Sequence, residues 1–95
     1  MEISRHAKQR IKERVGVGKG TVEKIAARAL EKGIPHNKTK GRLNKWITEQ
    51  YFYNETANNI RIYGEKTYIF RFELLITVIP LPRDLAKDLK KMIKA

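Results

Sequence analysis

The chain has 95 residues and a formal net charge of +11, from 21 lysines and arginines against 10 acidic residues. It contains no cysteine, which excludes disulfide bonds and thiolate metal sites. Its apolar runs are far shorter than the roughly 20 residues that span a bilayer. We therefore expect a single domain over 1–95 with one modest core. The first residues lack a signal-peptide pattern, so a cytoplasmic location without membrane attachment is expected.

The positive charge is concentrated in the first half of the sequence. Residues 1–50 hold thirteen basic and five acidic side chains, and residues 51–95 hold eight and five. This asymmetry favours a polyanionic partner, RNA or DNA. Solubility alone is the alternative explanation.

The first predicted element is a short helix over 4–16, with Ser4 as its cap and Gly16 as its end. Its apolar residues recur every four positions: Ile3, Ala7, Ile11 and Val15. A row of ionisable side chains recurs at the same interval: His6, Arg10 and Arg14. Because residues four apart share a helix face, these three side chains would project together beside the sheet.

A glycine-rich stretch over 15–21 separates this helix from the next. It is not a phosphate-binding loop, because a helix precedes it and Gly20 stands between Lys19 and Thr21. Residues 11–25 resemble the helix-turn-helix of bacterial repressors, in which a Gly-Val turn precedes Thr-Val at the start of the recognition helix. This resemblance implies a DNA-binding regulator that acts as a dimer, with Thr21–Lys32 as its recognition helix. Lys12 stands where that family usually has alanine, which ranks this interpretation second.

Two further helices are predicted before the sheet, over 21–32 and about 40–54. Gly33 and Pro35 would end the first, and Thr39 would cap the second. A group of cations lies at the start of the second helix, where it opposes the helix dipole: Lys38, Lys40, Arg42 and Lys45. Because these cations interact unfavourably with the helix dipole, their presence indicates phosphate binding. The alternative is that they lie in a solvated loop.

The apolar period then changes to alternation, which predicts strands over 59–63 and 66–72. Gly64-Glu65 joins them, and glycine at the first loop position fits a type II′ turn. This loop would place Arg61 opposite Tyr68. One face of the hairpin is apolar, and the other carries a set typical of nucleic-acid-binding platforms: Arg61, Tyr63, Lys66 and Tyr68. Packing of both tyrosines beneath the helices is the alternative.

Leu74–Pro80 is predicted as a third strand in a central position covered on both faces, because its apolar run is continuous. An amphipathic helix over 83–94 closes the chain, with Lys87, Lys90, Lys91 and Lys94 facing outward, and we interpret it as structural. The predicted fold is α+β: three N-terminal helices packed on a three-stranded antiparallel sheet, plus a C-terminal helix.

Residues 6–14 read His-Ala-x-x-Arg-Ile-Lys-Glu-Arg, and residues 76–78 read Ile-Thr-Val. Together they resemble a family of small bacterial and phage proteins that open with His-Ala-x-x-Arg-x-x-x-Arg and finish with an Ile-Thr-Val strand. That family is similar in layout to the RelE-type and barnase-like ribonuclease toxins. The resemblance implies an RNA-binding, toxin-like or phage accessory protein, with metal-free endoribonuclease activity as the enzyme hypothesis.

In that chemistry His6 would serve as acid or base, and Arg10 and Arg14 would hold the scissile phosphate. The remaining predicted contacts would complete the cationic site or stack a base: Arg61, Tyr63, Lys66, Tyr68 and Arg71. No cofactor or metal is expected. RNA or DNA is the expected partner, beside an antitoxin or host protein, with the chain a monomer or homodimer. The alternatives are a helix-turn-helix DNA-binding regulator and a non-catalytic phage-encoded inhibitor of a host protein.

Overall fold

The computed structural model describes Ser4, Arg5, Ala7, Gln9, Lys12, Glu13 and residues 19–94. The elements that it places within residues 19–94 are, in order, α2 (Lys19–Lys32), β1 (Ile34–Pro35), η1 (His36–Lys38, a 3-10 helix), α3 (Gly41–Tyr53), β2 (Asn59–Tyr63), β3 (Lys66–Arg71), β4 (Leu74–Pro80) and α4 (Arg83–Lys94). None of the described helices has both the length and the apolar character that crossing a bilayer requires.

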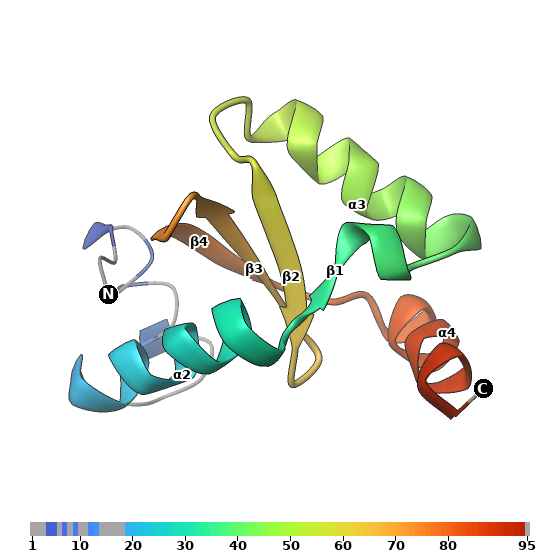
Figure 1. Cartoon of the computed structure of the whole chain (residues 1–95), viewed down its shortest axis with the longest axis horizontal. Coiled ribbons are helices and arrows are strands. Elements are labelled where there is room, and N and C mark those ends of the chain that lie inside the picture. Colours follow the sequence, from blue (N-terminus) through green and yellow to red (C-terminus); the bar gives the residue numbers. More distant parts are fainter. Residues whose placement is uncertain (1–3, 6, 8, 10–11, 14–18, 95) are drawn as a thin grey trace.

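The strands form one antiparallel sheet in the order β1-β2-β3-β4 (Figure 1). Arg61 of β2 lies opposite Tyr68 of β3, and Tyr63 lies opposite Lys66, which is the register expected from a two-residue loop. Pairing between β3 and β4 shifts by one residue next to Ile69, as in a β-bulge.

The expectation of three strands is wrong, because the described residues form a sheet of four. The central position expected for Leu74–Pro80 is wrong as well, because β4 lies at an edge of this sheet. The additional strand is β1, whose Ile34 and Pro35 lie opposite Ile62 and Arg61 of β2. A strand of two residues has no period that a pattern search can detect. Pro35 is tolerated there because β1 lies at the edge of the sheet.

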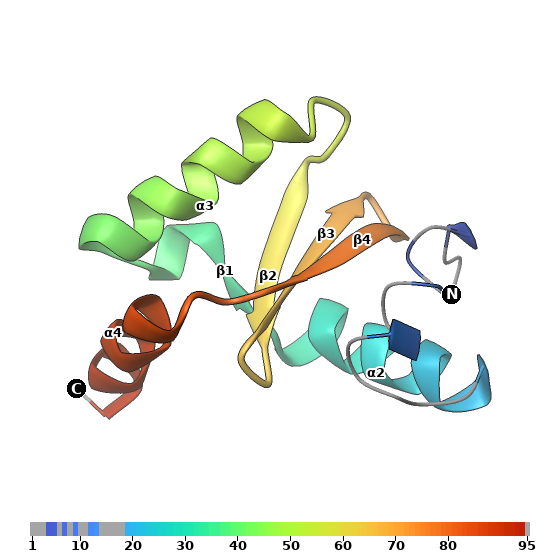
Figure 2. The same cartoon turned by 180° about the vertical axis from the view of Figure 1, so that it is seen from behind.

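The expectation that the N-terminal helices pack together on the sheet is also wrong. Figures 1 and 2 show α2 on one side of the sheet and both α3 and α4 on the other. On the α2 side, Ala26 and Ala29 belong to one buried cluster with Tyr68 and Phe70. The other face has its own cluster, formed by Leu43, Ile47, Ile60, Ile62, Ile69, Leu81, Leu85 and Leu89. The sheet is therefore covered on both faces, as in a three-layer sandwich.

Ser4 makes the hydrogen bond expected of a helix cap, since its Oγ accepts from the Ala7 N–H at 3.1 Å. It also contacts β4: its N–H donates to the Leu75 carbonyl at 2.9 Å, and its Oγ donates to the Ile76 carbonyl at 2.8 Å. Much of the helix expected over 4–16 falls outside the described residues, including His6, Arg10, Ile11, Arg14, Val15 and Gly16, and so does Ile3 before it.

Two local expectations need correction. The β2–β3 turn is type I′ and not type II′, because both Gly64 (φ 56°) and Glu65 (φ 61°) have positive φ. Thr39 does not cap α3, whose N-cap is Lys40 without a side-chain hydrogen bond. The Thr39 hydroxyl instead donates to the His36 carbonyl at 2.6 Å and so closes η1.

Candidate nucleic-acid interface

The residues expected to be catalytic, His6, Arg10 and Arg14, lie outside the described residues. The geometry below therefore concerns the expected nucleic-acid contacts and the cations around them.

The hairpin face expected to bind nucleic acid lies beneath α2 and does not form a continuous platform. Tyr68 is only 2% exposed, and its ring meets that of Tyr63 edge-on at a centroid distance of 6.5 Å. Burial, and to a smaller extent Tyr63, raises the pKa of Tyr68 to about 12. Arg61 is half-buried, and its guanidinium donates to the Gly33 carbonyl at 3.1 Å and to Asn59 Oδ1 at 3.2 Å. Tyr68 and Arg61 therefore help to hold α2 against the sheet.

The cations expected at the start of α3 do not act as one group. Arg42 donates from Nε and Nη2 to the carboxylate of Asp88 on α4, at 2.5 and 3.1 Å. The hydrogen bond and the charge of Asp88 raise the pKa of Arg42, and the same hydrogen bond lowers the pKa of Asp88. Lys38 and Lys40 are exposed.

Cationic side chains gather instead in a hollow between the tip of the β2–β3 hairpin and α4, which we call the hairpin hollow. It measures about 250 Å³ and is lined by Glu65, Lys66, Pro80, Leu81, Arg83, Ala86, Lys87 and Lys90. Lys66 comes from β3, while Arg83, Lys87 and Lys90 follow one face of α4 because of their helical spacing. Lys90 Nζ lies 3.4 Å from Glu65 Oε1, but both side chains are mostly exposed. Such a pair is weak, and the hollow keeps an excess of positive charge.

An apolar groove continues from the hairpin hollow past β1, and we call it the edge groove. It consists of two hollows of about 300 and 370 Å³ that share Lys32, Ile34 and Leu89. The first also contains Glu65, Ala86 and Lys90, which line the hairpin hollow. Its apolar lining includes Ile34, Ile62, Leu89 and Met92. Its polar and aromatic lining includes Lys32, Lys38 and Tyr63, beside Glu65 and Lys90.

The hairpin hollow and the edge groove together combine cationic side chains with apolar surface, and a nucleotide chain can use both. Lysine ammonium groups bind phosphates as compact charges, and apolar or aromatic surface accepts bases. Lys38, Tyr63 and Lys66 are the expected residues that the structure brings to this surface. Sequence reasoning missed the others: Lys32, Arg83, Lys87 and Lys90. The spacing of the α4 cations was visible, but it did not reveal that the hairpin tip lies opposite them.

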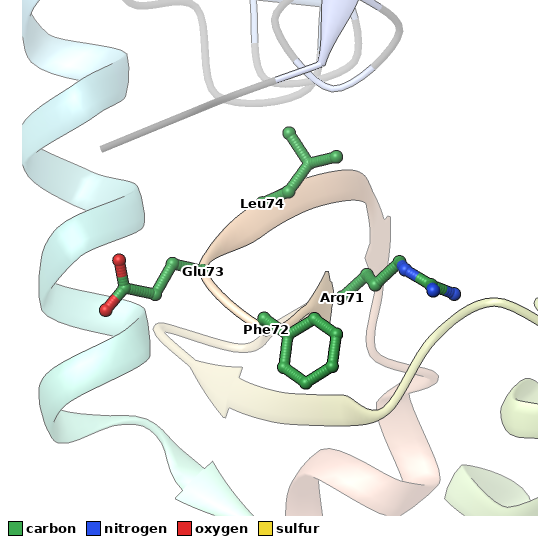
Figure 3. Close-up of a pocket in the computed structure, with 4 residues that line it drawn as sticks. All are labelled: Arg71, Phe72, Glu73 and Leu74. Atoms are coloured by element: carbon green, nitrogen blue, oxygen red, sulfur yellow. The ribbon is translucent and has the colours of Figure 1, made fainter.

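Arg71 lies at the other end of β3, as its last residue before the turn to β4 (Figure 3). Its Nη1 donates to the Thr56 carbonyl at 3.3 Å, and its guanidinium carbon lies 5.8 Å from the centre of the Phe72 ring. In Figure 3, Glu73 points toward α2 and Arg71 points the opposite way. Arg71 is therefore separate from the hairpin hollow.

No protein-family model, curated protein or solved structure matches this chain. In the part of the chain that the structure describes, no three histidine, aspartate or glutamate side chains are grouped as ligands of a metal ion would be. A function therefore has to be inferred from the geometry of the described side chains.

Proposed function

We propose that the protein binds RNA through the hairpin hollow and the edge groove. The observation that carries this proposal is the convergence of Lys66, Lys87 and Lys90 from two elements on one hollow. The adjoining edge groove adds Lys32 and further apolar surface. A strand of RNA could place its phosphates among the lysines and its bases on the apolar floor. We expect this activity in the cytoplasm, in a toxin-like or phage accessory protein.

Binding of this kind depends on salt. Each lysine that meets a phosphate releases a condensed counterion, so the logarithm of the affinity falls by about 0.7 per contact and per log unit of salt on single strands. Lys66, Arg83 and Lys87 have no acidic partner among the described residues. With these cations engaged, we expect a slope of about −2.

The test is fluorescence anisotropy of a labelled single-stranded RNA, titrated with protein over a range of salt concentrations. Replacing Lys66 and Lys87 by alanine should weaken binding at low salt by about tenfold and make the slope about 1.4 units shallower. The matched control replaces Lys24 and Arg28, which are exposed on α2 and line neither the hairpin hollow nor the edge groove, by alanine. Equal losses in both double variants would contradict a localised site.

The endoribonuclease hypothesis adds His6, Arg10 and Arg14 to this surface as the acid–base and phosphate-holding groups. Incubation of purified protein with the same RNA separates binding from cleavage. Cleavage by the wild type that His6→Ala abolishes, with binding retained, would support the hypothesis. RNA that is bound but stays intact would contradict the endoribonuclease hypothesis and would indicate a non-catalytic binding protein. Absence of RNA binding at low salt would favour the inhibitor of a host protein.

The helix-turn-helix alternative has less support from the described residues. The exposed side of α2 mixes Glu23 and Glu31 with Lys24 and Arg28, so it offers little net attraction to a DNA backbone. A sequence-dependent preference for duplex DNA over single-stranded RNA in the same titration would favour the helix-turn-helix regulator over the RNA-binding protein.

A further inference from the structure

The end of the molecule that contains the β3–β4 turn carries large aromatic side chains in solvent. Phe52 and Tyr53, the last residues of α3, are 76% and 80% exposed, and Phe72 in the turn is 69% exposed. The loop over 54–58 connects these places, because it follows α3 and forms hydrogen bonds to the turn (Figure 1). Exposed apolar patches mark interaction sites.

The turn that presents Phe72 is firmly held. The Phe72 N–H donates to Asn58 Oδ1 at 2.7 Å, and the Asn58 N–H donates to the Phe70 carbonyl at 3.0 Å. Arg71 adds its hydrogen bond to the Thr56 carbonyl. A ring on a pre-formed turn loses little conformational freedom on binding.

Phe72 occupies a conformation that its side chain disfavours. Its φ of 54° lies in the left-handed region, where glycine or asparagine would be less strained. The hydrogen bonds that fix the turn use backbone groups, the Asn58 amide and the Arg71 guanidinium, so they do not require a phenyl ring. A strained and exposed aromatic residue is a reason to look for a function.

The charges beside these rings argue against nucleic acid as the ligand. Glu55 and Glu73 are both exposed there beside Arg71, so these three side chains sum to a net charge of −1, although the whole chain carries a net charge of +11. A carboxylate next to an aromatic ring is complementary to an apolar hollow bordered by cations. The chain itself contains such a hollow, because the larger part of the edge groove joins Ile34, Leu89 and Met92 to Lys32 and Lys38.

We propose that the Phe72-Glu73 turn of one copy binds in the edge groove of a second copy. The phenyl ring enters the apolar hollow, which measures about 370 Å³, and the Glu73 carboxylate meets Lys32 and Lys38. The two partners use different surfaces, so the contact is heterologous and extends into chains or closed rings. This contact goes beyond the proposed RNA binding and is tested without RNA.

The test uses two variants, each of which keeps one half of the contact. The turn variant carries Phe72→Asn and Glu73→Gln, and asparagine suits the left-handed φ, so the turn should stay folded. The groove variant carries Lys32→Glu and Lys38→Glu, at exposed positions. Circular dichroism checks that both variants are folded.

Sedimentation velocity is then measured over a series of protein concentrations at physiological salt. The wild type should sediment faster as its concentration rises, and each variant alone should stay monomeric. An equimolar mixture should form dimers and nothing larger, because one intact turn and one intact groove remain. A wild type that stays monomeric, variants that associate like the wild type, or a mixture without dimers would each overturn the proposal.

Discussion

Arg42 and Asp88 join α3 to α4 through a two-point ion pair, with Nε–Oδ2 and Nη2–Oδ1 distances of 2.5 and 3.1 Å. Both helices cover the same face of the sheet, where Leu43 and Ile47 pack in one cluster with Leu85 and Leu89. The pair therefore fixes one covering helix against the other. It also gives Arg42, an expected phosphate contact, a structural partner.

The Arg42–Asp88 pair makes stability depend on pH. The hydrogen bond from Arg42 holds the pKa of Asp88 below its ordinary value. A carboxyl group with a lower pKa in the folded state stabilises the fold above its unfolded pKa, and this contribution is lost as pH falls through the folded pKa. We expect Asp88→Asn to lower the urea midpoint slightly at neutral pH, because the pair is exposed, and to change it less in acid. An equal loss at both pH values would show that the charge is not the cause.

Tyr68 makes stability depend on pH at the alkaline end. Its pKa is raised to about 12 by burial, so the folded state holds this proton more tightly than the unfolded state does. The resulting stabilisation is complete below the ordinary tyrosine pKa and is lost as pH rises toward 12. A titration followed by phenolate absorbance should show one late-ionising tyrosine. Tyr68→Phe should remove that late phase, and a titration unchanged by this substitution would contradict the assignment.

The register of the hairpin could be predicted because a two-residue loop fixes which residues lie opposite each other. The turn type could not, because types I′ and II′ both accept glycine at the first loop position. They differ at Glu65, whose positive φ is uncommon for a residue with a side chain. The apolar stripe of α2 predicted that this helix packs. It could not predict which face of the sheet the helix covers, because both faces of the sheet are apolar.

The candidate site was predictable only in part, because spacing along one element does not reveal what lies across from it. Lys66 and Lys38 were expected contacts and line the hollows. Lys87 and Lys90 were interpreted as the solvated face of a structural helix. Phe72 was expected to continue a strand, but β3 ends at Arg71 and the turn leaves the ring in solvent.

Gly33 should not tolerate a side chain. A Cβ at this position would lie 2.3 Å from the Ala29 carbonyl oxygen and 2.9 Å from the Arg61 Cβ, where α2 meets β2. We expect Gly33→Ala to lower the free energy of unfolding by about 3 kcal/mol, measured by urea denaturation. Gly64→Ala is the control: its Cβ would meet nothing within 4 Å, and its φ of 56° alone should cost about 1 kcal/mol. Similar losses for both would show that α2 shifts easily.

Tyr63 offers a way to separate base stacking from phosphate binding. It lines the edge groove and is half-buried, whereas its neighbour Tyr68 is buried. If a base stacks on Tyr63, Tyr63→Leu should weaken single-stranded RNA binding by about tenfold, which corresponds to about 1.4 kcal/mol. The salt slope should not change, because no phosphate contact is removed. Tyr68→Phe is the matched control and should bind RNA like the wild type. An unaltered affinity of Tyr63→Leu for RNA would show that the bases do not use this part of the groove.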